Sequence, residues 1–211
     1  MSISLDPYVL ELMASRMCHD IISPVGAVSN GIELMEELGP DGLEDAKDLI
    51  AKSAEQANRR LRIFRYCYGT AGSKQQIDTK DLRQTSFDFF EGGRAVLEWS
   101  ENAIENADSL PRGFLKSVLN LILLGGEMIT KAGVIKIRQE PDASMTISVS
   151  GENAAFREGM EAALSGTINP QDLDARLIHA YITGQLLRFF DLKLDVDKPA
   201  EGKTIFSLSV K

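Results

Sequence analysis

The chain has 211 residues, of which 44% are hydrophobic and 26% charged, as is usual for a soluble globular protein. Its formal net charge of −8 argues against nucleic acid or an anionic membrane as the main partner, because both favour a basic surface. The two cysteines fit neither a disulfide framework nor a zinc site, and the first seven residues do not resemble a secretory signal. We therefore expect free thiols and a cytoplasmic location.

Two long amphipathic helices are predicted for the first third of the chain. Asp6-Pro7 is typical of a helix start, and the run Gly39-Pro40-Asp41-Gly42 should separate a helix at about 6–38 from one at about 43–68. The apolar stripe expected to be buried on the first helix is Leu10, Met13, Met17, Ile21, Val25, Val28, Ile32 and Met35. A lone hairpin cannot bury two such stripes, so we expect a homodimer whose hairpins pack as a four-helix bundle.

The small and polar residues 69–76 indicate a linker, which divides the chain into domains at 1–70 and 77–211. Beyond the linker, helices and strands follow in a mixed order. Helices are predicted at 78–90, 109–130, 154–164 and 170–190, and strands at 94–100, 134–138, 145–149, 192–196 and 204–210. This order predicts an α/β sandwich, so the whole chain has the α+β class. The most apolar stretch, 114–129, is too short to cross a bilayer.

The clearest chemical signal is His19, which lies on the first helix and faces away from its apolar stripe. A neutral imidazole is a good acceptor for a transient phosphoryl group. Asp20 follows it directly, and its carboxylate could hold one ring nitrogen and leave the other free. Pro24 removes the hydrogen bond that the carbonyl of Asp20 would accept, and it bends the helix just beyond the histidine.

The surroundings of His19 are suited to the close approach of another protein. Ser23, Gly26 and Asn30 are small, and we expect them, with Arg16, to contact a partner. From the turn near Pro40, His19 should lie opposite about Leu61, so we also expect Arg59 and Arg62 to flank the imidazole and attract an acidic partner. A solvated charged face is an equally good interpretation of either arginine. His179, which lacks acidic neighbours in sequence, is predicted to be structural.

His19-Asp20-Ile21-Ile22-Ser23-Pro24 resembles the histidine box of sensor histidine kinases, and the order of hairpin, linker and α/β domain is the same as in those kinases. The second domain departs from that pattern at three motifs. Leu124 stands where a magnesium-binding asparagine is expected, and Ser150-Gly151-Glu152-Asn153-Ala154 replaces the acidic adenine-binding motif. The stretch 172–176 replaces a glycine-rich lid. The comparison with kinases therefore implies a degenerate ATPase-like domain without a nucleotide site.

A kinase-like frame without a nucleotide site, with 17–20, 23–27 and 30–34 as its signature, is very similar to the ChpT-like histidine phosphotransferases of alphaproteobacterial cell-cycle phosphorelays. The resemblance implies a dimer that takes a phosphoryl group on His19 from the receiver domain of a hybrid histidine kinase. It would then pass that group to a response-regulator receiver domain, with Asp20 orienting the imidazole. The receiver would supply Mg²⁺, so the chain itself would need no cofactor and no metal.

Two other functions remain open at this point. The chain could be a divergent ATP-dependent sensor histidine kinase, which would bind ATP and phosphorylate itself. It could also be a non-catalytic adaptor that binds receivers, in which case replacement of His19 by alanine would leave its activity intact.

Overall fold

The computed structural model describes residues 6–70, 78–99, 104, 110–140 and 144–211. The chain divides into two compact units, 1–64 and 65–211. The boundary therefore falls in the last turns of the second helix rather than in the predicted linker. Residues 65–70 belong to the second unit because they bond within it: the backbone carbonyls of Cys67 and Gly69 accept hydrogen bonds from Asn120 and Lys116. Most of the expected linker, 71–77, lies outside the described residues.

The first unit is a helical hairpin made of α1 (Pro7–Leu38), a 3₁₀ turn (Gly39–Gly42) and α2, which runs Leu43–Cys67 into the second unit. The side chain of Asp6 caps α1 by accepting from the backbone nitrogen of Tyr8 at 2.9 Å. The two helices approach closely at Gly31, where a Cβ would lie 2.6 Å from Cγ1 of Ile50. The predicted limits of both helices are confirmed to within one residue.

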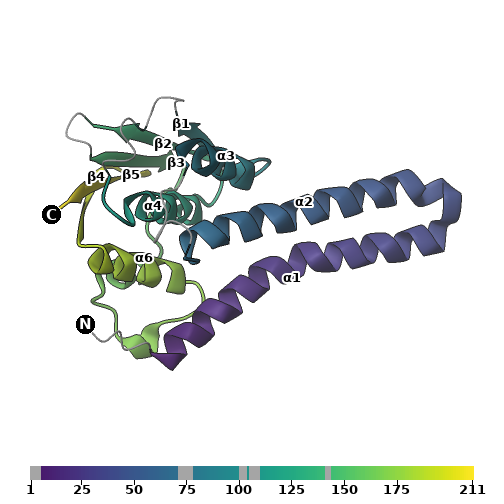
Figure 1. Cartoon of the computed structure of the whole chain (residues 1–211), viewed down its shortest axis with the longest axis horizontal. Coiled ribbons are helices and arrows are strands. Elements are labelled where there is room, and N and C mark those ends of the chain that lie inside the picture. The colour runs from purple at the N-terminus through teal and green to yellow at the C-terminus, as the bar shows by residue number, and fades with distance from the viewer. Residues whose placement is uncertain (1–5, 71–77, 100–103, 105–109, 141–143) are drawn as a thin grey trace. The chain divides into compact units, whose positions relative to one another are not determined.

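The second unit contains a five-stranded sheet in the order β1-β2-β3-β5-β4 (Figure 1). Among the strands that the structure describes, only β1 and β2 pair in parallel. The strands are β1 (Ala95–Trp99), β2 (Gly133–Gln139), β3 (Met145–Gly151), β4 (Leu192–Ala200) and β5 (Lys203–Val210). The two antiparallel pairs predicted from alternation, β2 with β3 and β4 with β5, are confirmed.

The helices of this unit bury the apolar face of the sheet. The central helix α4 (Phe114–Met128) is buried on nearly all sides and packs against β2 and β3. The helix α6 (Ile178–Phe189) packs against α4 and β4, and α3 (Thr79–Phe90) packs against β1. The α+β fold class expected from the sequence is therefore confirmed.

Three predicted helices are shorter in the structure. The helix α4 begins at Phe114 rather than 109, after Gly113 in the left-handed region at φ 80°. The helix α5 covers only Met160–Ser165, because Gly159 has a φ of 76°, which helical backbone does not allow. The range 170–190 splits into a 3₁₀ turn (Pro170–Asp172) and α6, since the carboxylate of Asp174 accepts from two following backbone nitrogens and forms a turn between them.

Candidate functional site

The imidazole of His19 is presented to solvent from the middle of α1, with 85% of its side chain exposed. Ser23, Gly26 and Asn30 are exposed as well. Steps of four, three and four residues place these four positions on one line along the helix. An ideal Cβ on Gly26 would meet nothing within 4 Å, so the surface beside the histidine is open. The structure thus brings His19 and three of the predicted partner-contact residues onto one polar face.

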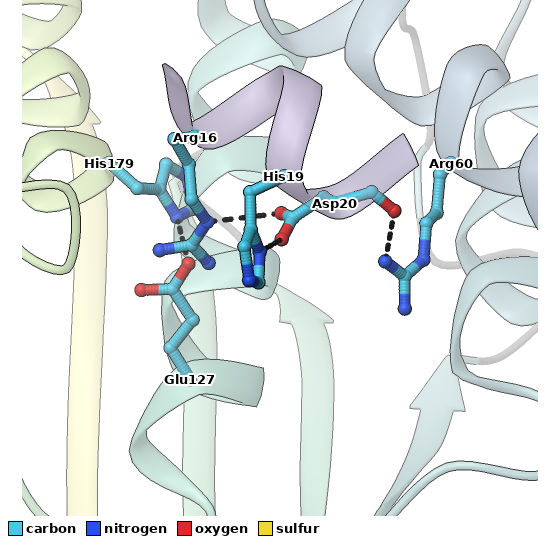
Figure 2. Close-up of polar contacts among 6 residues, drawn as sticks. All are labelled: Arg16, His19, Asp20, Arg60, Glu127 and His179. Carbon is cyan, nitrogen blue, oxygen red and sulfur yellow. Dashed lines mark hydrogen bonds and ion pairs between the residues drawn. The ribbon is translucent and has the colours of Figure 1, made fainter. Parts of the chain in front are cut away.

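Asp20 lies against the imidazole and is itself held by an arginine. Its Oδ1 lies 3.3 Å from Nδ1 of His19, and its Oδ2 accepts a hydrogen bond from Nε of Arg16 at 3.0 Å (Figure 2). Arg16, one helical turn before Asp20, therefore contacts the residue that faces the histidine. The carboxylate engages Nδ1, so Nε2 of His19 is the ring nitrogen that this contact leaves free.

A second arginine reaches α1 at the same level from α2. Nη1 of Arg60 donates a hydrogen bond to the backbone carbonyl of Asp20. That carbonyl belongs to the residue four before Pro24, so proline leaves it without the usual helical donor. The predicted register of the hairpin, with His19 opposite about Leu61, is consistent with this contact.

The sequence interpretation did not single out Arg60 and named its neighbours instead. Arg59 donates from Nε to Glu55, one turn earlier on its own helix, at 3.0 Å. Arg62 is exposed. The α2 residue that the structure brings to the backbone beside His19 is Arg60, and a role of Arg59 and Arg62 at a partner stays a prediction. The unpaired carbonyl that Pro24 leaves was the signal that could have identified Arg60.

The apolar stripe of α1 is not buried as a whole in the single hairpin, in agreement with the expectation that one hairpin cannot bury it. Leu10, Val25 and Ile32 have 54%, 50% and 49% of their surface exposed. The residues of α1 that are buried are Val9, Pro24 and Gly31. The reason is geometric, since one neighbouring helix covers only a narrow strip of another.

An exposed apolar seam runs beside the polar face that carries His19. We define the seam as Cys18, Ile22, Val25, Ser29 and Ile32, all of which are exposed. Their spacing of four and three residues is that of a helix contact line. The seam is one residue out of phase with the line through His19, which places it about 100° round the helix.

The comparisons with known proteins agree on one family. Residues 79–202 match the family model described as the histidine phosphotransferase C-terminal domain. The chain is 35% identical over 194 residues to the protein phosphotransferase ChpT of Brucella abortus, and the match covers 90% of each chain. The chain belongs to the ChpT-like histidine phosphotransferase family. The expected function of a histidine phosphotransferase in a phosphorelay is thereby confirmed.

One solved structure supports the same fold for this ChpT-like chain, and another is a weaker match. A bacterial phosphotransferase determined at 1.7 Å matches it with a TM-score of 0.81 and 32% identity over 98% of each chain. The histidine kinase AdeS of Acinetobacter baumannii matches with a TM-score of 0.47 and 13% identity, over 92% of this chain and 97% of that one.

In the second unit of this ChpT-like chain, the residues that the sequence analysis placed at the kinase motifs make contacts within the unit. Leu124 is fully buried in the core. Asn120, one turn earlier, donates to the carbonyls of Cys67 and Lys116 at 3.3 and 2.8 Å. Glu152 forms an ion pair with Lys131 at 2.5 Å. These side chains pack and bond within the unit.

The other histidine, His179, lies in the interior of the second unit. Its side chain is 2% exposed, and its Nδ1 lies 3.0 Å from Oε1 of Glu127 (Figure 2). The ring of Tyr68 packs edge-on against it with a centroid separation of 6.0 Å. This burial agrees with the structural role predicted for His179.

Burial also shifts the pKa of three side chains in the second unit. Desolvation raises the pKa of the Cys67 thiol, and it lowers the pKa of the Lys116 ammonium. The pKa of Tyr66 is raised, first by burial and then by its hydrogen bond to Asp81. Both cysteines are free thiols, Cys18 exposed and Cys67 buried, as predicted.

The described residues offer neither a cluster of metal ligands nor a membrane-spanning helix. They hold no group of three or more histidine, cysteine or acidic side chains that could bind a metal ion. Among the described helices, none has the length and apolarity that a membrane span requires.

Proposed function

We propose that His19 is the phosphoacceptor of this histidine phosphotransferase. It takes a phosphoryl group from the aspartyl phosphate of a receiver domain in a hybrid histidine kinase and gives it to the aspartate of a response-regulator receiver. The observation that carries this proposal is the exposed imidazole of His19 with its Nδ1 against the carboxylate of Asp20. Phosphoryl transfer mainly requires positioning of the acceptor, and this arrangement supplies it.

In the first step, Nε2 of neutral His19 attacks phosphorus and forms the P–N bond. The bond between phosphorus and the carboxylate oxygen of the receiver breaks, and that oxygen leaves as part of a free carboxylate. The proton stays on Nδ1, where the charge of Asp20 stabilises the positive ring that develops. The second step is the reverse reaction with another receiver, whose carboxylate attacks phosphorus and returns the neutral imidazole.

The receiver is proposed to bring the Mg²⁺, and ATP is not a substrate in this proposal. Leu124 supports the second point, because a buried leucine has no oxygen ligand to offer a magnesium ion. The proposal also keeps the cytoplasmic location expected for a protein with two free thiols.

We propose further that two copies pair through the apolar seam of α1. The seam leaves Ile22, Val25 and Ile32 in water when the hairpin is alone, with 68%, 50% and 49% of their surface exposed. Burial of such side chains between hairpins stabilises a four-helix bundle. The polar face with His19 lies about 100° away and stays open to a receiver in this arrangement.

The deciding experiment incubates the full chain with a purified, phosphorylated receiver domain and follows the phosphoryl group. We expect acid-labile, base-stable phosphate on the chain, and none after His19→Ala. Label from ATP and Mg²⁺ alone would identify a divergent kinase. An adaptor would retain its effect on receivers after His19→Ala.

A further inference from the structure

One backbone hydrogen bond of α1 is missing beside the proposed phosphoacceptor. Pro24 has no N–H, so the carbonyl of Asp20 loses the donor that an α-helix normally provides four residues later. This carbonyl follows His19 by one residue. A carbonyl without a partner at this level would leave the backbone free to tilt toward water, and the side chains of 19 and 20 would move with it.

The other helix of the hairpin supplies the missing donor. Arg60 extends from α2 and donates from Nη1 to the carbonyl of Asp20, and both residues are partly buried. A guanidinium carries several donors on a rigid plane, so it can hold a carbonyl in a fixed direction. Arg60 thus takes the place of the N–H that Pro24 lacks.

Asp20 is consequently held at two points. Arg16 bonds its carboxylate at 3.0 Å, and Arg60 bonds its backbone carbonyl (Figure 2). The first contact orients the group that faces Nδ1 of His19. The second contact fixes the segment of backbone from which both His19 and Asp20 extend.

We propose that Arg60 is a positioning residue for phosphoryl transfer through His19, acting through the carbonyl of Asp20. This inference rests on the proposed function. It differs from a docking role, in which the positive charge of Arg60 would only attract an acidic receiver. Positioning affects the transfer rate within the complex, whereas docking affects the receiver concentration at which the rate is half-maximal.

The pair formed by Pro24 and Arg60 allows a double-mutant test. In Pro24→Ala the new N–H of residue 24 can donate to Asp20, and the arginine becomes dispensable for that bond. We therefore compare the wild type, Arg60→Met, Pro24→Ala and the double variant in single-turnover transfer from a phosphorylated receiver. Lys52→Met is the control for loss of a positive charge on α2, since Lys52 is exposed and pairs with Asp48.

We expect Arg60→Met to lower the maximal transfer rate by about tenfold and to leave the half-saturating receiver concentration within about twofold. In the Pro24→Ala background, Arg60→Met should lower the maximal transfer rate by less than about threefold. Lys52→Met should transfer at the wild-type rate. Equal losses in both backgrounds, or a change confined to the half-saturating concentration, would overturn the proposal.

A second measurement does not depend on transfer. The carbonyl carbon resonance of Asp20 reports the hydrogen bond directly, and we expect it to shift in Arg60→Met. The spectrum of the double variant should match that of Pro24→Ala at this carbon. If the resonance does not respond to Arg60→Met, Arg60 does not bond this carbonyl in solution and the proposal fails. A wild-type chain that accepts no phosphoryl group would instead refute the proposed function.

Discussion

Oδ1 of Asp20 lies 3.3 Å from Nδ1 of His19, and these two adjacent side chains meet on the exposed side of one helix. Neighbours in a helix point about 100° apart, so this contact requires both side chains to turn toward each other. Arg16 bonds the far oxygen of the same carboxylate and favours that orientation.

The first prediction concerns the charge on Asp20. Asp20→Asn keeps the size of the side chain but removes the charge that stabilises the protonated ring, so we expect transfer through His19 to slow by about tenfold, equivalent to about 1.4 kcal/mol. Single-turnover transfer from a phosphorylated receiver measures this change. Asp48→Asn on the exposed face of α2 is the matched control. Equal rates for Asp20→Asn and the wild type would remove the orienting role.

The second prediction concerns the open surface at Gly26. Since an ideal Cβ there meets nothing within 4 Å, Gly26→Ala should stabilise the helix by about 1 kcal/mol and leave transfer unchanged within about twofold. Gly26→Phe should fold equally well and raise the half-saturating receiver concentration by at least about tenfold, because the ring fills the approach to His19. Thermal unfolding and transfer kinetics check the two effects. Efficient transfer by Gly26→Phe would show that receivers dock elsewhere.

The third prediction tests the apolar seam. Ile32→Glu places a charge in the proposed contact between two copies, and we expect the dimer to dissociate at concentrations where the wild type is dimeric. Analytical ultracentrifugation gives the mass directly. The control is Glu36→Gln, an exposed change one turn further along α1. A wild-type chain that sediments as a monomer, or an Ile32→Glu dimer, would contradict the pairing.

The fourth prediction concerns the buried pair of Glu127 and His179. Glu127→Leu removes the partner of Nδ1 and leaves a buried ring nitrogen without its acceptor, which should lower the free energy of unfolding by about 1–3 kcal/mol. The double variant Glu127→Leu with His179→Phe should lose less than the sum of the single changes. Urea unfolding of all four proteins gives the coupling. Additive losses would mean that the two side chains do not interact.

The fifth prediction follows from the raised pKa of Cys67. When the pH rises above 9.0, the thiol of the unfolded chain, whose pKa is 9.0, loses its proton. The buried thiol of the folded chain keeps its proton at that pH, because its pKa is raised. The contribution of Cys67 to stability is therefore intact below pH 9.0 and is lost as the pH rises above that value. Tyr66, whose pKa is also raised, makes the free energy of unfolding fall with pH in a higher pH range. Lys116, whose pKa is lowered, makes the free energy of unfolding rise with pH.

Cys67→Ala isolates this thiol. We expect the free energy of unfolding to fall less steeply with pH in the variant, by up to about 1.4 kcal/mol per pH unit above pH 9.0. Cys18→Ala, which removes the exposed thiol, is the matched control. Parallel pH profiles for Cys67→Ala and the wild type would show that the thiol ionises equally in both states.

The parts of the fold that were predicted correctly are those set by local chemistry. Asp6 and Pro7 fix the start of α1, and the turn at 39–42 separates it from α2. Helical spacing also accounts for the line through His19, Ser23, Gly26 and Asn30 on one face. These features depend on neighbouring residues and on the helical period, both of which the sequence displays.

The features that the sequence did not reveal are those that one residue of helical phase, one backbone conformation or a contact distant in sequence decides. Adjacent residues of a helix point about 100° apart, so an estimate of the register good to one residue cannot distinguish Arg59 from Arg60. The left-handed conformation of Gly159 depends on tertiary packing, and a Cβ there would lie 2.9 Å from Cδ1 of Leu177. The boundary of the units depends on bonds from α4 to Cys67 and Gly69, which are distant in sequence.

The separation between the apolar seam and the polar face of α1 has a practical consequence for rewiring signalling. If receivers dock and subunits pair as proposed, partner choice can be changed at Ser23, Gly26 and Asn30 while the residues proposed to pair subunits stay untouched. A variant with a different receiver partner could work in the same cell as the native chain, provided that the two did not form mixed dimers. To prevent mixed dimers, a second and independent set of changes is needed at Ile22, Val25 and Ile32. Separating two such pathways therefore requires one set of changes for receiver choice and another for subunit pairing.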